Sequence, residues 1–441
     1  MKMKMKGFVG IQLDGPSLDD RDEVAFLDEL KDKTDLNAVM LLHMDRFRYS
    51  DTHSAGTIFK QPQEGIDDKG RDLFDRMAEA AEEREIALVL GASEHRWGYH
   101  PAYPGYTTIA QVDCYGQKIR TSCVNNPTWL NFQLACMEDA VREHPYLAGI
   151  MFMHERVGPM SAVLFPSAWQ GGRAPWCFCE HCQTKGDRRG IDVDRAKMGY
   201  QALLDLFEED GPEPRDGYFI TFWRILNKYP EIFAWEQLQW DSLQDFRAAI
   251  SGAARVVDSE MKVGFHFQHA TMHGQPIWRA MEDPERVAQY ADWVKPSVYP
   301  GASGGRYRNA LSTLQKSLLR DLPEDVAHRF IAGIFLRDAE IGMDMIQNKD
   351  KQQDYFPAEW VRTEVARLVE AVDPKPLFAG LGIGIPGGEK TETPELVAEW
   401  TEACYEGGAK GILLSRHYSE MRPELLAAAG EVIKRCSPEV E

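Results

Sequence analysis

Short apolar runs alternate with amphipathic helical stretches along most of the chain. Each run is followed by polar residues and then by a helical pattern of about ten residues or more. A parallel sheet wrapped by helices requires this alternation, because each strand must return through a helix before the next parallel strand begins. The candidate strands are Phe8–Leu13, Ala38–His43, Ile86–Leu90, Ala148–Met153, Lys262–Phe267, Val294–Val298, Phe330–Leu336, Leu377–Ile385 and Gly411–Leu414.

These runs predict an α/β fold, a (β/α)8 TIM barrel with long βα-loop insertions. Nine candidates compete for eight strand positions, and Phe330–Leu336 is the run that we expect to lie outside the barrel. The last two runs each follow a strong helical pattern, over Pro357–Val372 and Pro394–Tyr405, and have the glycine-rich apolar character of buried parallel strands. An open doubly wound sheet is the alternative, but no G-x-G-x-x-G motif opens the first helix.

A length of 441 residues fits one barrel domain with insertions. We expect a single domain over residues 1–441, with insertions at about 97–127 and 156–258. The second insertion contains a cysteine group and an aromatic helical stretch around Trp223, Trp235 and Trp240. Long excursions in barrels usually leave from the carboxyl ends of the strands, where they build the site.

Charge and cysteine content narrow the choice of partner and compartment. The net charge of -19 argues against nucleic-acid and anionic-membrane surfaces and favours a neutral or cationic small substrate. The basic MKMKMK start precedes an apolar run that is too short for a signal peptide, and no run is long enough to span a membrane. Eight cysteines in a chain of this length argue against a disulfide framework. We therefore expect a cytoplasmic protein, and a homo-oligomer is compatible with the sequence.

Polar side chains follow the predicted strands, and in a barrel these strand ends meet at one mouth. Carboxylates, imidazoles and aromatic rings in such a ring suit a sugar pocket. The predicted substrate-binding residues are Asp14, His43, Asp45, Glu94, His154, His266, His269, Tyr299, Arg416 and Tyr418.

Glu155 is the leading catalytic candidate. It ends the apolar run LAGIMFMHE, where a carboxylate can reach a glycosidic oxygen as general acid. An ion pair with Arg156 or a helix-capping role is the structural alternative. A glycosidase needs a second carboxylate, and Glu420 is the first choice. The other acids that remain in play are Asp14, Glu94, Asp338 and Glu340.

Three cysteines lie within six residues in the sequence WCFCEHC. Cys177, Cys179 and Cys182 have a spacing that suits one tetrahedral metal ion. Cys123 is the preferred fourth ligand, Cys114 the alternative, and His181 the third choice. Four thiolates close the coordination sphere, so the predicted cofactor is a structural zinc that pins the long insertion. Reduced thiols without metal are the alternative.

Histidines and tryptophans offer further candidates. His266, His269 and His273 lie close together in sequence and could hold a catalytic metal. However, His266 and His269 are three residues apart and cannot both point the same way from a regular strand, so hydrogen bonding to substrate is the preferred role. The aromatic residues that could stack on sugar faces are Trp97, Tyr99, Trp176 and Trp293.

A strand ending in glutamate, followed by a Cys-x-Cys-x-x-Cys loop, resembles the family 42 β-galactosidases and related retaining glycosidase barrels, in which a cysteine-bound zinc lies beside the catalytic mouth. The resemblance implies an acid/base role for Glu155. In that family an asparagine precedes the acid/base glutamate, whereas here it is His154. The predicted seventh strand, GLGIGIP, carries no carboxylate where that family has its nucleophile, and the nearest acid is Glu389.

A closer likeness is to a group of uncharacterised glycoside-hydrolase-like barrel proteins, and it extends from about residue 120 to the C-terminus. The segments that carry it are CVNNP, HERVGP, WCFCEHC, DGYFITFWRIL, VKPSVYP and LLSRHYSEMR.

The leading functional hypothesis is a glycoside hydrolase that acts on a small carbohydrate or glycoside. One alternative is a metal-dependent sugar isomerase, epimerase or lyase on the same barrel. The other is a non-catalytic carbohydrate-binding barrel.

Overall fold

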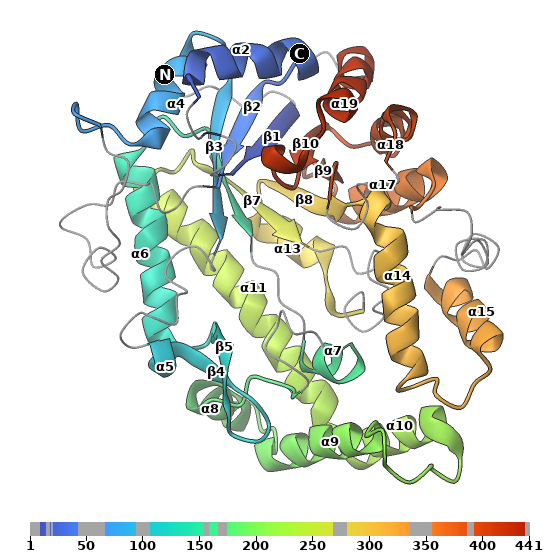
Figure 1. Ribbon diagram of the computed structural model, residues 1–441. Coiled ribbons are helices and arrows are strands. Elements are labelled where there is room, and N and C mark those ends of the chain that lie inside the picture. Colours follow the sequence, from blue (N-terminus) through green and yellow to red (C-terminus); the bar gives the residue numbers. More distant parts are fainter. Residues whose placement is uncertain are drawn as a thin grey trace.

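The computed structural model (Figure 1) describes residues 9–14, 18, 21–42, 67–93, 106–153, 158–165, 174–267, 280–335, 355–385 and 392–436. Within these ranges, no helix has the length and apolar character needed to cross a membrane.

Eight parallel strands close into a barrel. The ring closes because β1 pairs with β2 on one side and with β10 on the other, so that Gly10 lies opposite both Ala38 and Leu413. This closure confirms the predicted (β/α)8 fold and rules out the open doubly wound sheet. Around the ring the strands are β1 (Val9–Leu13), β2 (Ala38–Leu41), β3 (Ala87–Ser93), β6 (Gly149–Met153), β7 (Lys262–Phe267), β8 (Trp293–Val298), β9 (Phe378–Gly382) and β10 (Gly411–Ser415).

Eight of the nine candidate runs overlap these strands. The ninth, Phe330–Leu336, falls in helix α15 (Glu324–Phe335) as far as the structure describes it, so the expectation that it lies outside the barrel is confirmed. An antiparallel hairpin of β4 (Ala110–Val112) and β5 (Lys118–Ser122) was not predicted. Its strands are short and carry polar residues, so their apolar alternation is weak.

Helices cover the outside of the barrel, and most begin at residues suited to capping. Asp22 and Asn126 accept hydrogen bonds from the first turns of α2 and α6, and Asp72 and Asp75 form a capping box on α4. The covering helices are α2 (Glu23–Thr34), α4 (Leu73–Glu82), α6 (Pro127–Glu143), α11 (Glu231–Val257), α13 (Pro284–Tyr290), α17 (Ala358–Val372), α18 (Pro394–Glu406) and α19 (Pro423–Cys436).

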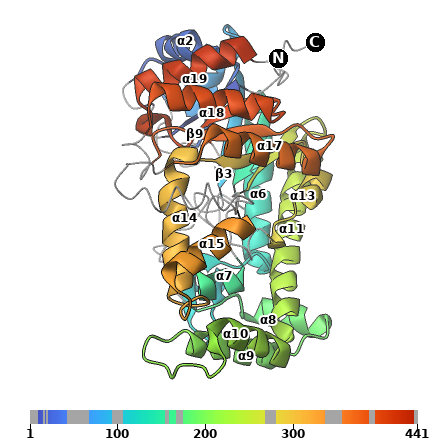
Figure 2. The same cartoon turned by 90° about the vertical axis from the view of Figure 1, so that its right-hand side faces the viewer.

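The excursions between strands and covering helices extend the molecule away from the barrel, as Figures 1 and 2 show. Helix α11 spans both parts, because it packs on α6 and α13 beside the barrel and on α9 in the extension. A third excursion, after β8, was not predicted. The inserted elements are α5 (Tyr106–Ile109) with the hairpin; α7 (Pro159–Leu164), α8 (Glu180–Arg188), α9 (Val193–Leu206) and α10 (Gly217–Lys228); and α14 (Pro300–Gln315) with α15.

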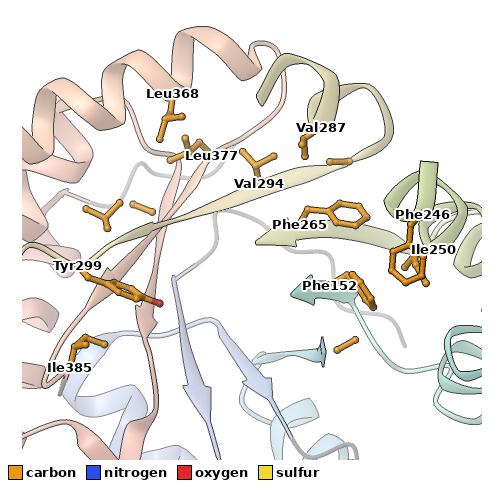
Figure 3. Close-up of a cluster of buried hydrophobic side chains, with 14 of the residues drawn as sticks. Phe152, Phe246, Ile250, Phe265, Val287, Val294, Tyr299, Leu368, Leu377 and Ile385 are labelled. Carbon is orange, nitrogen blue, oxygen red and sulfur yellow. The ribbon is translucent and has the colours of Figure 1, made fainter. Parts of the chain in front are cut away.

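Alternating strand residues face opposite sides of the barrel wall. One set packs against the helices. Figure 3 shows this layer, with Phe152 and Phe265 of neighbouring strands close to Phe246 and Ile250 of α11. The ring centroids of Phe152 and Phe246 lie 5.9 Å apart.

The other set fills the barrel with an apolar plug. Trp293 was a candidate for sugar stacking, but it is 1% exposed, and its ring lies over Gly264 and beside Phe378. It therefore packs in the core. The buried plug residues are Ala38, Met40, Leu42, Ala87, Val89, Ala148, Met151, Trp293, Phe378 and Leu413.

Candidate functional site

Polar side chains replace the plug toward the carboxyl ends of the strands. His266 faces the interior because it pairs with Lys295 in the same alternating set as Gly264 and Trp293. By the same alternation, Gln12 lies in line with Gly10, and Ser415 with Leu413. We call this group the mouth cluster: Gln12, Asp14, His266, Lys295, Ser297, Tyr299 and Ser415, all buried.

Glycines on one strand make room for large side chains from the next. A Cβ on Gly380 would lie 2.0 Å from Cε and 2.6 Å from Nζ of Lys295, and a Cβ on Gly382 would lie 2.5 Å from Cδ1 of Tyr299. Lys295 Nζ donates to the Tyr299 hydroxyl at 3.4 Å. Lys295 of β8 and Tyr299, the residue directly after this strand, therefore occupy space that the glycines of β9 leave open.

His266 and Ser297 form a second contact within the mouth cluster. Nε2 of His266 lies 3.4 Å from the hydroxyl of Ser297 on the neighbouring strand. Both residues are nearly inaccessible to solvent. The contact joins β7 to β8, and the role of His266 toward substrate stays a prediction.

The first and last strands are joined at the mouth by polar contacts. Ser415 donates to Oε1 of Gln12 at 2.8 Å, and Nε2 of Gln12 donates to the Arg416 carbonyl at 2.7 Å. Asp14 accepts from the Ser419 hydroxyl at 2.7 Å. Asp14 therefore anchors the segment after β10 to the end of β1.

Glu420, the predicted second carboxylate, forms a forked ion pair with Arg416. Nε of Arg416 donates to Oε2 at 3.1 Å and Nη2 donates to Oε1 at 2.5 Å. The fork orients the carboxylate, as bidentate arginine contacts do. The ring of Tyr418, in the same short helical turn η4 (Tyr418–Glu420), packs on Phe26 of α2 with centroids 5.2 Å apart.

Several predicted site residues lie outside the described residues. The catalytic role of Glu155 stays a prediction. The predicted site residues in this group are His43, Asp45, Glu94, His154, Glu155 and His269.

Lys295 and Glu392 are not among the predicted site residues. Lys295 could have been found, because it is the one charged residue of the predicted strand Val294–Val298. Glu392 is 3% exposed, and its Oε2 accepts from the backbone N–H of Gly384 at 2.6 Å. A Cβ on Gly301 would lie 2.2 Å from its Oε1, so Glu392 joins the end of β9 to the first turn of α14. Its position just before a helix start gave no signal of this burial.

Four buried thiols gather where two insertions meet, and we call them the cysteine centre: Cys123, Cys177, Cys179 and Cys182. Cys123 follows β5, whereas the other three precede or begin α8. Their sulfur atoms all lie within 4.8 Å of one another. Cys123 Sγ is 3.4 Å from Cys179 Sγ and 3.5 Å from Cys182 Sγ. Cys123, which we preferred as the fourth ligand, is therefore confirmed as a member of this cluster.

The cysteine centre has the donor chemistry of a tetrahedral thiolate metal site. Zn–S bonds of about 2.3 Å place sulfur atoms about 3.8 Å apart, close to the two distances above. The Asn125 side-chain amide donates to Cys182 Sγ at 3.3 Å, and Lys185 in turn holds Asn125. Such outer contacts commonly orient metal ligands. The cluster could therefore bind a metal ion.

The thiols affect one another's pKa values. Burial raises the pKa of Cys177, whereas hydrogen bonds from the neighbouring thiols lower the pKa of Cys179. The two alternatives for the fourth ligand lie elsewhere. Burial raises the pKa of Cys114 to about 12, and its carbonyl accepts from Gln201. His181 is partly exposed and lies 3.6 Å from Glu180.

A second acidic group has a structural explanation. Asp72, Asp75 and His144 lie within metal-ligand distance of one another. However, Asp72 and Asp75 are the two halves of the α4 capping box, and His144 Nε2 lies 2.6 Å from Asp72 Oδ2. These contacts tie the start of α4 to the end of α6.

Glu236 of α11 is buried where this helix meets α7 and α9. Its Oε1 accepts from the Met160 N–H at 2.5 Å and from the Tyr200 hydroxyl at 2.6 Å. Its Oε2 is buried without a hydrogen-bond partner in the described part of the chain. Desolvation by burial raises the pKa of Glu236 to about 7. This carboxyl therefore joins α7, the next described element after β6, to α9 in the extension.

Known proteins resemble this chain in fold. No protein-family model and no curated protein matches the chain. Solved structures do match it. A cold-adapted β-galactosidase from Rahnella sp. R3 is 12% identical with a TM-score of 0.55, over 100% of this chain and 57% of that one. A GH42 β-galactosidase from G. stearothermophilus is 11% identical with a TM-score of 0.53, over 100% and 58%.

The PgaB (BpsB) glycoside hydrolase domain from Bordetella bronchiseptica is 12% identical with a TM-score of 0.52, over 98% of this chain and 99% of that domain. The chain thus spans little more than half the length of the β-galactosidases. At such low identities the likeness concerns the fold, and at that level the resemblance to glycosidase barrels of the family 42 kind is confirmed.

Proposed function

We propose that the protein is a glycoside hydrolase that uses Glu155 as general acid/base. The observation that carries the proposal is the closed barrel with a buried polar cluster at the carboxyl ends of its strands, which is where barrel enzymes build their sites. β6, the fourth barrel strand, ends at Met153, two residues before Glu155. The named β-galactosidases and the PgaB domain are glycosidases on the same fold.

The second carboxylate in this proposal is Glu420. Its forked contact with Arg416 holds both oxygens in a defined orientation, which supports a role as base or nucleophile. Asp14 is the described alternative, and its contact with Ser419 places it at the end of the first strand. Glu392 is a further candidate, because it follows the seventh strand and is buried.

We also propose that the cysteine centre binds a structural zinc ion. Four thiolates would leave no open position for substrate, so the ion would stabilise the insertions and take no part in the reaction. Cys123 would link the hairpin of the first insertion to α8 of the second.

The test of the hydrolase is a screen of aryl glycosides and disaccharides with detection of the released product. On a substrate found in this way, we expect Glu155→Gln to lower kcat by about 10²- to 10⁴-fold, because proton donation to the leaving group is lost. The thermal unfolding midpoint should stay unchanged.

Glu260→Gln is the matched control, because it makes the same change at an exposed residue just before β7. Undiminished turnover in Glu155→Gln would reject the assignment. Loss of turnover on chelation without unfolding would favour the metal-dependent isomerase or lyase instead.

A further inference from the structure

Half of the large apolar side chains that are exposed in the described part of the chain lie on two helices. They number five of ten, although α10 and α15 contribute only 12 residues each. Isolated exposed apolar residues are normal on a protein surface, but a contiguous group indicates a contact surface. We call this group the apolar patch: Ile220, Trp223, Val326, Phe330 and Ile334, which are 39–53% exposed.

The apolar patch is continuous across the two helices. Phe219 of α10 is half-buried and links them, because its ring centroid lies 6.5 Å from that of Trp223 and 6.2 Å from that of Phe330. On α15, Val326, Phe330 and Ile334 follow at intervals of four residues and share one face of the helix. Figures 1 and 2 show α10 and α15 in the extension beyond the barrel.

Helix α15 is apolar on both of its sides. Its inner face buries Ala327, Ile331 and Ala332, while its outer face carries the three patch residues. A helix that is apolar all round usually lies inside a protein, because one apolar face is enough to attach a helix to a core. The outer face of α15 therefore has the character of a surface that another chain covers.

Contacts near the start of both helices hold the apolar patch in a fixed shape. The Tyr218 N–H donates to Oδ2 of Asp321 at 3.2 Å, which ties the start of α10 to the segment before α15. Arg320 Cζ lies 5.3 Å from the Tyr218 ring centroid, and its guanidinium donates to the carbonyls of Glu208 and Glu209. A surface that is ordered before binding loses less entropy on association.

The size of the apolar patch fits one side of a dimer interface. Aromatic side chains offer about 150–250 Å² each and aliphatic ones somewhat less, so the exposed fractions of the five patch residues correspond to about 400 Å². An interface of standard size buries about 800 Å² per partner, of which about 56–65% is apolar. One patch thus supplies most of the apolar area that one side of such an interface needs.

Charges around the apolar patch are balanced. Two exposed ion pairs, Arg224 with Asp216 and Arg329 with Asp325, account for most of them. Two copies can therefore approach through this surface without the like-charge repulsion that a net charge of -19 produces between other faces. Attraction to an anionic membrane would instead need an excess of cations around the patch. The charged residues of both helices and of the α10 cap are Asp216, Arg224, Lys228, Glu324, Asp325 and Arg329.

We propose that α10 and α15 form a self-association surface through which two copies of the chain make a two-fold symmetric dimer. In a two-fold contact both copies use the same patch, so that α10 of one packs on α15 of the other. Trp223 and Phe330 anchor the contact, because buried aromatic side chains carry much of the binding energy of an interface. The dimer goes beyond the proposed hydrolase activity and does not depend on it.

The test is the mass of the full chain in solution, measured by light scattering and sedimentation over a range of micromolar concentrations. We expect the wild-type protein to have twice the mass of one chain. Phe330→Arg places a charge in the desolvated contact and should raise the dissociation constant of the dimer by about thirtyfold or more. Trp223→Ser should act in the same direction, because it removes the other aromatic anchor.

Val326→Arg and Val256→Arg are a matched pair, since both change an exposed valine of a helix. Val256 lies outside the apolar patch, near the end of α11 that packs beside the barrel. Val326→Arg should raise the dissociation constant by about fivefold or more, and Val256→Arg by less than about twofold. Because all of these positions are exposed, the thermal unfolding midpoint should stay unchanged, which separates loss of the dimer from misfolding.

A wild-type chain that stays monomeric would overturn the proposal. A dimer that Phe330→Arg leaves intact would overturn it as well, because the two copies would then meet elsewhere. Flotation of a monomeric wild-type chain with phosphatidylcholine vesicles, lost in Phe330→Arg, would assign the apolar patch to a lipid surface instead. A dimer that dissociates in Phe330→Arg and Trp223→Ser but persists in Val256→Arg supports the proposal.

Discussion

The mouth of the barrel and the cysteine centre both unite residues that are distant in the chain, but they are assembled differently. Backbone pairing of eight strands brings the mouth residues together, and pairs of glycine and large side chains such as Gly380 with Lys295 fix their positions. The cysteine centre brings together four thiols from two insertions, beside backbone hydrogen bonds from Cys114 to Pro175 and from Phe178 to Val112. Strand pairing around the whole ring positions the mouth residues, whereas four side chains form the cysteine centre, and a metal bound there would need each of them.

The largest effect is expected from a substitution in the cysteine centre. Cys177→Ser should abolish stoichiometric metal binding and lower the free energy of unfolding by at least about 4 kcal/mol, because losing a structural metal removes its binding energy from the folded state. Elemental analysis and denaturant unfolding measure both quantities.

Two controls accompany this variant. Cys436→Ser, at a half-buried thiol outside the cluster, should change the free energy of unfolding by less than about 0.5 kcal/mol. Cys114→Ser should keep the metal, since Cys114 lies outside the group of four. Equal metal content in wild type and Cys177→Ser would contradict the zinc assignment.

The second prediction concerns Glu236, a buried carboxyl in the extension that joins α7 to α9. Its pKa is about 7 in the folded protein, above the ordinary value of 4.5. The folded state therefore binds the proton more tightly than the unfolded state, and stability falls as pH rises from 4.5 through 7. Ionisation of Glu236 should lower the free energy of unfolding by about 2.5 kcal/mol when the pH rises from 5 to 8.

Glu236→Gln should remove that part of the pH dependence while keeping an acceptor for Met160 and Tyr200. Denaturant unfolding of both proteins at pH 5 and pH 8 measures the difference. If the two proteins lose the same stability over this interval, Glu236 does not titrate there.

The smallest expected effect tests the packing of the mouth. Gly380→Ala would place a Cβ 2.7 Å from the Pro296 carbonyl as well as against Lys295, so we expect it to cost about 2 kcal/mol of unfolding free energy. Gly252→Ala makes the same change in α11, where nothing lies within 4 Å, and should stabilise the protein by about 0.5–1 kcal/mol. The same sign for both variants would show that helix propensity or backbone freedom, and not the space filled by Lys295, governs Gly380.

The sequence predicted the barrel well because its strands are buried on both faces. Runs such as Gly411–Leu414 must then be continuously apolar, and this signal is local. The three clustered cysteines were equally visible, since ligands within six residues can share one ion without knowledge of the fold. Helix starts at Asn126 and Thr393 also follow from local capping and the prolines after them.

Other features could not be predicted from local sequence, because they depend on contacts between segments that are distant in the chain. Phe330–Leu336 is as apolar as a strand, yet the part that the structure describes is helical, because the eight strand positions are filled by other runs. The buried position of Lys295 depends on a missing side chain at Gly380, eighty-five positions away. Glu392 gave no signal, since its burial results from backbone groups of β9 and α14 closing around it.

By itself, the sequence thus determined the strand order, the class of fold and three members of the cysteine centre, because apolar periodicity and ligand spacing act over a few residues. The tertiary structure alone decided which polar groups share the mouth, that Lys295 reaches the Tyr299 hydroxyl, and that Glu236 is buried between α7 and α9. The packing, burial and charge environment of a side chain depend on neighbours from distant segments, and these neighbours are in place only once the barrel has closed.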